Sequence, residues 1–326
     1  MNEDFPKNEL TPQRYQSVDY RAEISEEAAR ESIRLTAPDF EIQTMEQLRG
    51  GIGSMAFMVN GEYIFRFPRH ARADEGLQVE MRLLPELEKQ LAISIPHFEF
   101  TGKQINNDLH FVGYKAIPGI EIEPETMLDQ EGKPNPHLTE QIATFFRDMH
   151  SFDVEKAKSL GVPQPSLRAR MMGQILDARE YLFPLVREKF PQEADTIIDT
   201  TEKAFKDYLS DEENFNYEPQ LIHGDLEAEH IFVDPQGKNI TGIIDFGSTR
   251  LDDPDYDLWR PHFWFGREFT ELLLRSYPHK DPERLYRKME FFQTAQEGQR
   301  VVRAILVNDE ARAQHALGRI KRRLSD

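Results

Sequence analysis

The sequence contains no cysteine, which excludes disulfides, thiolate metal sites and a cysteine nucleophile. It has no apolar run near the ~20 residues that a membrane-spanning helix needs. Its first ten residues are charged and lack the apolar segment of a signal peptide. We therefore expect a cytoplasmic protein that does not enter a membrane. The pattern G-x-x-x-x-G-K-[S/T] is also missing, which excludes a P-loop.

Positive charge is scarce as well, with 40 Lys and Arg against 58 Asp and Glu and a formal net charge of −18. We expect no nucleic-acid partner, because binding nucleic-acid phosphates requires a basic face. The imbalance is uneven: from Lys206 to Arg260, fourteen acidic residues stand against four basic ones. A cleft lined in this way would attract a polycationic ligand and speed its association. An acidic surface that only promotes solubility is the alternative.

The stretch 221–258 organises the chain, and it has the pattern of a β-hairpin with an acidic residue at each edge. An apolar run leads into a His-Gly-Asp triplet that ends at Asp225, and a second apolar run follows His230. Residues 234–239 contain Pro and Gly and have the composition of a turn. The next β-branched run ends at Asp245, the first residue of an Asp-Phe-Gly triplet.

Such a pair of carboxylates suits phosphoryl transfer. One carboxylate orients the attacking hydroxyl and accepts its proton, while a second holds the magnesium that bridges the nucleotide phosphates. Protein kinases use H-R-D-x-x-x-x-N followed by D-F-G for these tasks. Here Asp225 has the position of the base, Asp245 that of the metal ligand, and His230 stands where the Asn would be. Either triplet alone could be an ordinary turn, but both in this order and spacing favour a kinase-like site.

The motifs HGDxxxxH, IIDFG and DDPDYDL resemble those of the aminoglycoside phosphotransferase family, from about Ala37 to the end of the hairpin. His230 and the sequence ITGIID, which ends at Asp245, most resemble the aminoglycoside 2″-phosphotransferases. The resemblance implies an α+β, bilobal protein-kinase-like fold, with an N-terminal antiparallel sheet lobe and a larger, mainly helical C-terminal lobe. It also implies Mg2+ as cofactor, held by His230 and Asp245, and ATP or GTP as phosphate donor.

A second hairpin is predicted near the N-terminus. Runs of strand-forming residues at 55–59 and 63–67 flank Asn60-Gly61, a strong signal for a tight two-residue turn. Glycines precede this hairpin, and glycine lets backbone amides approach phosphates closely. Because kinase-like folds place such a loop over the nucleotide, we expect Gly51, Gly53 and Ser54 to bind it.

Arg66 lies on the second strand, where the resemblance expects a basic residue that binds phosphate. In the helix that follows, Glu80 shares the apolar face of Leu77 and Leu84. A carboxylate on an apolar face needs a partner, and Arg66 is the expected one. An Arg66 that only reaches solvent is the alternative. Pro85 is expected to end or kink this helix, or to begin another one at its first turn.

Strands at 97–101 and 109–117 complete a predicted five-stranded lobe, and Pro118-Gly119 breaks the pattern. We place a hinge before this break, where the backbone of Lys115 and Ile117 would bind the nucleotide base. The domains predicted on this basis are an N-terminal nucleotide-binding lobe, 1–117, with an extension at about 1–20, and a catalytic and substrate-binding lobe, 118–326. Helices are expected over 25–35, from a cap at Thr139 to His150, within 166–210, and over 267–277 and 287–307.

The predicted function is transfer of a nucleotide γ-phosphate to a hydroxyl of an aminoglycoside, a small polycationic substrate, with the 2″-hydroxyl favoured by resemblance. Macrolide, choline, homoserine and fructosamine kinases share the fold, so the fold alone does not identify the substrate. A protein kinase is less favoured, because residues 248–253 leave no room for an activation loop and no A-P-E follows. A non-enzymatic binding protein would be expected to have lost Asp225 or Asp245. A monomer is expected.

Overall fold

The computed structural model describes residues 24–48, 53–129, 131–306 and 309–323. These residues form two compact units: a sheet unit of residues 24–164 and 219–280, and a helical unit of residues 165–218 and 281–323. Among the described residues, no helix combines the length and apolar composition needed to cross a membrane.

These two units do not coincide with the predicted lobes, which divide the chain at residue 117. One reason is that Ser94, N-terminal to that boundary, accepts a hydrogen bond of 3.0 Å from the backbone of Ile243 and bridges to Gly242. The predicted lobes 1–117 and 118–326 stay a prediction, and the proposed extension at about 1–20 lies outside the described residues.

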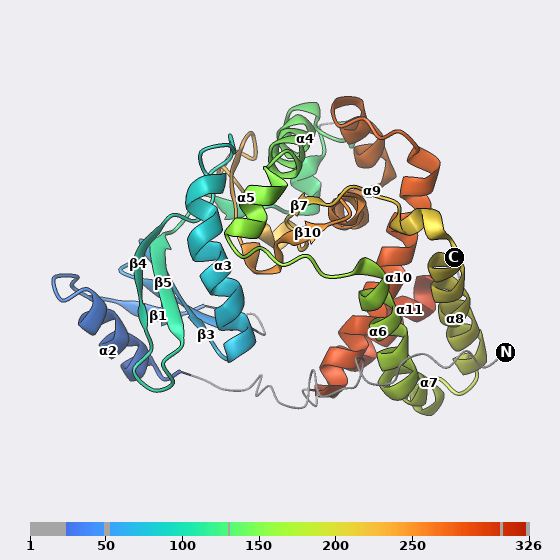
Figure 1. The fold of residues 1–326 in the computed structure, drawn as a ribbon, viewed down its shortest axis with the longest axis horizontal. Helices are drawn as coiled ribbons and strands as arrows, with labels where there is room; N and C mark the ends of the chain where they lie inside the picture. Colours follow the sequence, from blue (N-terminus) through green and yellow to red (C-terminus); the bar gives the residue numbers. More distant parts are fainter. Residues whose placement is uncertain (1–23, 49–52, 130, 307–308, 324–326) are drawn as a thin grey trace. The chain divides into compact units, whose positions relative to one another are not determined.

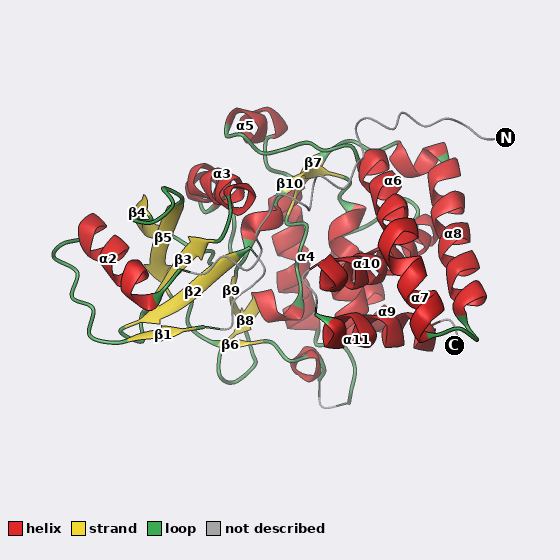
Figure 2. Cartoon of the chain, turned by 90° about the horizontal axis from the view of Figure 1, so that it is seen from below, coloured by secondary structure: helices red, strands yellow, loops and turns green. Residues whose placement is uncertain are grey.

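The sheet unit contains a five-stranded antiparallel sheet in the order β1-β2-β3-β5-β4 (Figure 2). Its strands are β1 (Met45–Gln47), β2 (Ser54–Val59), β3 (Tyr63–Pro68), β4 (Phe98–Lys103) and β5 (His110–Lys115). The predicted turn between β2 and β3 is confirmed, with Asn60 and Gly61 at φ values of 56° and 67°. These two positive values are typical of the tight turn that matches strand twist.

Alternation along β3 distributes its side chains between two helices. Phe65 and Phe67 pack with α2 (Glu26–Thr36) in one apolar cluster, while Ile64 packs with α3 (Ala71–Leu87) in another. Successive strand residues point to opposite faces, so Arg66 shares the α3 face with Ile64. Figure 1 shows the two helices on either side of the sheet.

The predicted start of α2 is confirmed, since the Ser25 side chain accepts a hydrogen bond from the Ala28 amide as its N-cap. One prediction was that helix α3 ends at Pro85. The helix instead continues to Leu87. Proline removes one backbone hydrogen bond, and here it does so in the last turn, where little of the helix remains.

The remainder of the sheet unit carries two small sheets, with strand orders β6-β8-β9 and β10-β7. Its strands are β6 (Ile120–Glu121), β7 (Gln220–Ile222), β8 (Ile231–Val233), β9 (Ile240–Ile243) and β10 (Arg250–Asp252), and its helices are α4 (Pro136–His150), α5 (Val154–Ser159) and α9 (Asp255–Ser276). The predicted hairpin is confirmed as the antiparallel pair β8 and β9.

Two helix starts differ from the predictions. Helix α4 is capped by Asn135 rather than by Thr139, whose hydroxyl instead donates to the Asn135 carbonyl inside the first turn. Helix α9 begins at Asp255 and contains a non-helical Gly266, with φ 84°. The predicted helix 267–277 therefore matches only the part of α9 that follows Gly266.

The helical unit consists of helices from two separate stretches of chain, as Figure 2 shows. The first stretch runs through a π-helical turn (Ala178–Leu182) between two α-helices. The α-helices of the unit are α6 (Leu167–Asp177), α7 (Phe183–Lys189), α8 (Ala194–Ser210), α10 (Pro282–Leu306) and α11 (Glu310–Arg323). The helices predicted within 166–210 are confirmed. The helix predicted over 287–307 is confirmed as part of α10, which begins earlier, at Pro282, and is described as far as Leu306; residue 307 lies outside the described residues.

Candidate active site

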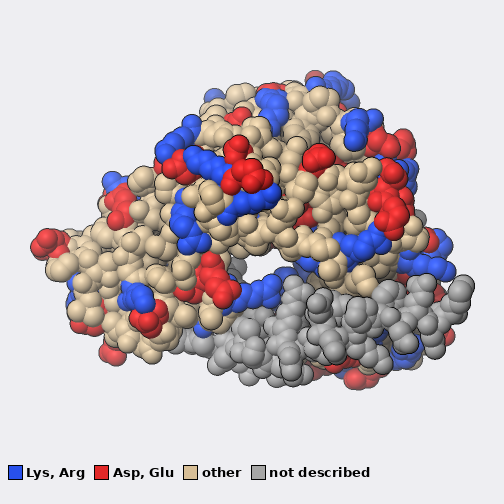
Figure 3. All heavy atoms as spheres, viewed as in Figure 1, with Lys and Arg blue, Asp and Glu red and all other residues tan. Residues whose placement is uncertain are grey.

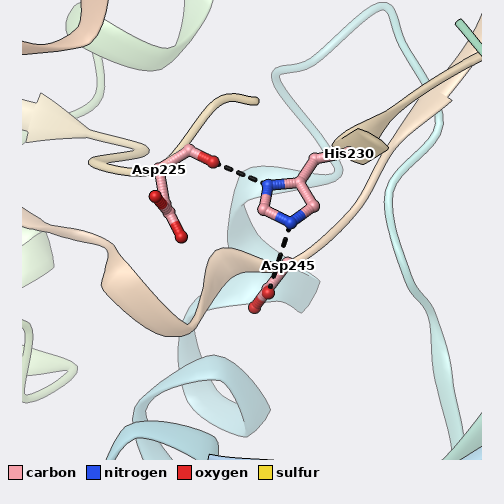
Figure 4. A group of neighbouring side chains, drawn as sticks. All are labelled: Asp225, His230 and Asp245. Atoms are coloured by element: carbon pink, nitrogen blue, oxygen red, sulfur yellow. Dashed lines mark hydrogen bonds and ion pairs between the residues drawn. The ribbon is translucent and has the colours of Figure 1, made fainter. Parts of the chain in front are cut away.

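Three side chains from the predicted motifs meet at one end of the β8–β9 hairpin. Asp225 lies in the loop after β7, His230 immediately precedes β8, and Asp245 follows β9. One potential ligand atom from each residue lies within 4.8 Å of the other two. Figure 4 shows the two aspartates on either side of the imidazole. The hairpin thus brings together residues that are 20 positions apart in the sequence (245 − 225).

The hydrogen bonding of His230 leaves one ring nitrogen for a metal. Its Nδ1 lies 2.6 Å from the backbone oxygen of Asp225, so this nitrogen carries the proton and donates. Nε2 then has its lone pair free and lies 3.6 Å from Oδ2 of Asp245. A hydrogen bond from the opposite nitrogen is the usual way in which a ligating imidazole is oriented. His230 can therefore serve as a ligand together with Asp245.

Asp245 adopts a left-handed backbone conformation, with φ 64° and ψ 64°. Residues other than glycine rarely adopt this conformation, and it often marks functional sites. Burial acts to raise the pKa of the Asp245 carboxyl, but the charge of Arg66 lowers it below its usual range. The carboxylate is thus held ionised, as a cation-binding group must be.

The predicted pair of Arg66 and Glu80 is confirmed. Two hydrogen bonds, of 2.8 and 3.1 Å, join the guanidinium to the two carboxylate oxygens, and Glu80 is only 2% exposed. Burial acts to lower the pKa of Arg66, but the charges of Glu80 and Asp245 outweigh it and raise this pKa. Nη2 of Arg66 also lies 4.0 Å from Oδ1 of Asp245. A permanently charged group therefore lies beside the predicted metal ligand.

A buried carboxylate on α9 holds the loop that carries Asp225. Asp257 accepts hydrogen bonds from the backbone amides of His223 and Gly224, at 2.8 and 2.6 Å. It also bonds to Nε2 of His150, at 3.0 Å, whose other nitrogen bonds to Tyr277. His150 thus helps to hold Asp257 in place. The loop backbone is fixed before any ligand binds.

Gly224 is required in this loop for two reasons. Its φ of 79° lies in the left-handed region, and a Cβ atom there would meet the Arg250 side chain and lie 2.6 Å from the Ser248 carbonyl oxygen. The neighbouring His223 is buried, which lowers its pKa. Its Nε2 donates to the Ile244 carbonyl and its Nδ1 accepts from the Asp225 amide, an arrangement that fits a neutral ring.

Two charged residues at the site, Arg260 and Glu227, were not predicted from the sequence. Arg260, on α9, forms ion pairs with Oδ1 of Asp225 and with Oε1 of Glu227. The Arg260 side chain is only 9% exposed. A signal was available, because an arginine follows directly on Trp259 in an otherwise apolar and aromatic stretch of α9.

The structure describes four of the other predicted nucleotide-binding residues, Gly53, Ser54, Lys115 and Ile117. Gly51 lies outside the described residues. The Gly53 carbonyl accepts from the Arg69 amide, and Ser54 begins β2. Lys115 ends β5, and the Ile117 side chain lies close to Gly242 of β9. Contact of any of these residues with a nucleotide stays a prediction.

Comparison with known proteins relates this geometry to a family. Residues 44–292 match the model of the phosphotransferase enzyme family. An uncharacterized Bacillus subtilis (strain 168) protein, YcbJ, is 23% identical over 235 residues, which are 66% of this chain and 67% of that protein.

Solved structures of other phosphotransferases resemble the chain over nearly all of its length. The GDP and kanamycin complex of APH(2″)-IIIa is 28% identical, with a TM-score of 0.82 over 90% of this chain and 97% of that one. Macrolide 2′-phosphotransferase type I is 18% identical, with a TM-score of 0.66 over 91% and 98% of the two chains, and shows the fold alone. These likenesses confirm the kinase-like fold that the sequence predicted. Because the family match covers most of the chain and contains both acidic motifs, the protein belongs to the phosphotransferase enzyme family.

Proposed function

We propose that this phosphotransferase is a small-molecule kinase that transfers the γ-phosphate of ATP or GTP to a hydroxyl of an aminoglycoside. The 2″-hydroxyl is the favoured position. The observation that carries the proposal is the convergence of Asp225, His230 and Asp245 within 4.8 Å, beside the Arg66–Glu80 ion pair. This arrangement supplies a base, metal ligands and a cation for phosphate, which phosphoryl transfer requires together.

The residues present fit a magnesium ion. Magnesium prefers oxygen ligands, which Asp245 offers as an ionised carboxylate, and the free Nε2 of His230 supplies one nitrogen. When bound, the ion would neutralise charge on the nucleotide phosphates. Arg66 would grip a phosphate oxygen, and Asp225 would orient the acceptor hydroxyl and accept its proton. Gly53, Ser54 and the backbone of Lys115 and Ile117 are proposed to complete the nucleotide site.

The size of the acceptor is limited by the chain after Asp245. Only residues 248–253 separate the Asp-Phe-Gly triplet from Pro254, and α9 begins at Asp255. A protein kinase docks its substrate on a longer segment at this point. The short connection therefore supports a small-molecule acceptor.

Charge favours a cationic acceptor. The acidic excess of residues 206–260 would attract a polycation. On the face drawn in Figure 3, acidic and basic side chains are interspersed. The kanamycin bound in the APH(2″)-IIIa structure supports the same class of acceptor. A macrolide or an amino alcohol is the alternative.

A phosphorylation screen tests the proposal. The protein would be incubated with magnesium and either ATP or GTP, with kanamycin, gentamicin, a macrolide or choline as acceptor, and the phosphorylated product identified by mass spectrometry. We expect phosphate on an aminoglycoside and nucleoside diphosphate in equal amount. Transfer only to the macrolide or to choline would establish the alternative acceptor, and no transfer to any acceptor would contradict the proposal.

A further inference from the structure

Arg260 joins two carboxylates beside the reacting centre. Its Nη2 atom pairs with Oδ1 of Asp225 and its Nη1 atom with Oε1 of Glu227. The guanidinium carbon lies 4.5 Å from the centre of the Trp259 ring. Arginine is the residue suited to this arrangement, because its planar fork presents two donors in fixed directions. The two carboxylates therefore fix the orientation of the guanidinium, and the guanidinium fixes theirs.

One turn of α9 contacts both the backbone and the side chain of the Asp225 loop. Asp257 and Arg260 are three residues apart and so lie on the same side of the helix. Asp257 accepts hydrogen bonds from the loop backbone at His223 and Gly224, whereas Arg260 holds the side chain of Asp225. The backbone contacts set where the loop lies. They leave the Asp225 side-chain torsions free, and it is these that Arg260 restrains.

We propose that Arg260 is a positioning residue that orients Asp225 for the phosphoryl transfer, with Glu227 as its anchor. This inference rests on the proposed role of Asp225 as the base. Arg260 occupies Oδ1 of Asp225 and leaves Oδ2, in a carboxylate that is 30% exposed, to the acceptor. Glu227 holds the second arm of the guanidinium and so prevents it from binding both oxygens of Asp225.

In the phosphoryl transfer that this orientation serves, the acceptor O–H bond breaks and its proton passes to Oδ2 of Asp225. The acceptor oxygen forms a bond to the γ-phosphorus, while the bond from that phosphorus to the bridging oxygen breaks and its electron pair leaves with the nucleoside diphosphate. Arg260 touches neither the acceptor nor the phosphate in this scheme and acts only through Asp225.

A double-mutant cycle tests the inference. Arg260→Gln, Asp225→Asn and the double variant would be compared for kcat and KM with kanamycin as acceptor, and for Mg-nucleotide affinity by calorimetry. We expect Arg260→Gln to lower kcat by about 10- to 100-fold, as misplacement of a reacting group does, with nucleotide affinity unchanged. In the Asp225→Asn background the same change should lower kcat no further, because residues that act through one another are not additive.

Two results would overturn the inference: an equal loss of kcat in both backgrounds, or no loss in the wild-type background. Arg267→Gln is the matched control, since Arg267 lies on the same helix, is 66% exposed and pairs with Glu271 rather than with the site. Activity that is unaffected by Asp225→Asn alone would instead contradict the proposed function. The two failures are therefore distinguishable.

Two further measurements keep the test decisive. If Arg260→Gln does not fold, Arg260→Lys retains the charge but not the two-pronged geometry, so its kcat should still fall in the wild-type background only, and full activity would refute the role. If kanamycin is not an acceptor, nucleotide hydrolysis with water as acceptor provides the same cycle. A crystal structure of the Arg260 variant should show the Asp225 carboxylate rotated, and an unmoved carboxylate would overturn the inference.

Discussion

Both oxygens of Glu80 are bound by the guanidinium of Arg66, at 2.8 and 3.1 Å, and this pair ties strand β3 to helix α3. The pair is almost inaccessible to solvent, with Arg66 14% and Glu80 2% exposed. Removing either side chain would leave the other as an unpaired, largely buried charge. The position of α3 and the direction of Arg66 therefore depend on each other.

Replacing Glu80 with Ala should lower both stability and nucleotide affinity. Breaking one partner of a buried pair typically costs about 3–5 kcal/mol, and the freed Arg66 would lose its direction. Denaturant unfolding and calorimetric titration with nucleotide measure the two effects. Glu75→Ala, at an exposed position of the same helix, is the control and should change neither. A Glu80→Ala protein of wild-type stability would refute the account.

Asp245→Ala should abolish the magnesium dependence of nucleotide binding as well as the reaction rate. The reason is that Asp245 offers the ionised oxygen ligand of the proposed metal site. Calorimetry of nucleotide binding with and without magnesium would measure the loss. Asp225→Asn is the comparison, since it should leave this binding nearly intact. Normal Mg-nucleotide binding by Asp245→Ala would show that the metal role is wrong.

His230 should make magnesium affinity depend on pH. Its Nδ1 donates to the Asp225 carbonyl, so a metal must bind at Nε2, and a protonated imidazole has no lone pair to offer there. Affinity should therefore fall as the pH is lowered, because protons compete with the metal for Nε2. His230→Asn should flatten this dependence and retain activity. An equally steep dependence in His230→Asn would mean that the histidine only holds the loop.

Stability at mildly acidic pH should depend on His70, whose Nδ1 accepts a hydrogen bond from the Ala73 amide and caps α3. Burial, followed by the charges of Arg72 and Arg69, lowers the pKa of His70 below its ordinary value of about 6.5. The unfolded chain then takes up the proton more readily than the folded one. The contribution of the cap is complete above about pH 6.5 and is lost as the pH falls through the lower, folded-state value.

Replacing His70 with Asn provides the test, because Asn caps helices well and does not titrate. The free energy of unfolding, measured between pH 7.5 and 5, should fall less steeply in His70→Asn than in the wild type. At pH 7.5, His70→Ala should be less stable than the wild type by about 1 kcal/mol, as loss of a cap causes, and this difference should narrow as the pH falls and the wild type loses its cap. A pH dependence that is unchanged in both variants would exclude His70 as its source.

The parts of the site that follow local rules could be predicted from the sequence. Turn residues at Asn60-Gly61 and at 234–239 predicted the two hairpins, and each of these signals lies within one or two adjacent elements. Helix periodicity placed Glu80 on the apolar face of α3 and so predicted that it needs a partner. The resemblance to kinase-like proteins supplied Arg66 as that partner.

The contacts made by α9 could not be predicted in the same way. Arg260 and Glu227 are 33 residues apart, a separation that no helix or strand period spans. The aromatic residues around Arg260, together with Pro261, obscured the helical pattern of 255–265. Thr139 was taken as a cap because threonine favours that position, but Asn135 precedes it and has the stronger preference. Tertiary contacts decided the position of Arg260, whereas the cap at Asn135 is a local feature.

Transfer of labelled γ-phosphate to kanamycin by the wild-type protein and by Asp225→Asn is the most direct test of the central claim. The account predicts phosphorylated kanamycin with the wild type, and turnover reduced by roughly 10²-fold or more in the variant, as expected for loss of a general base. Nucleotide affinity should be nearly the same in both proteins. Equal turnover by the wild type and the variant would contradict the claim that Asp225 is the base.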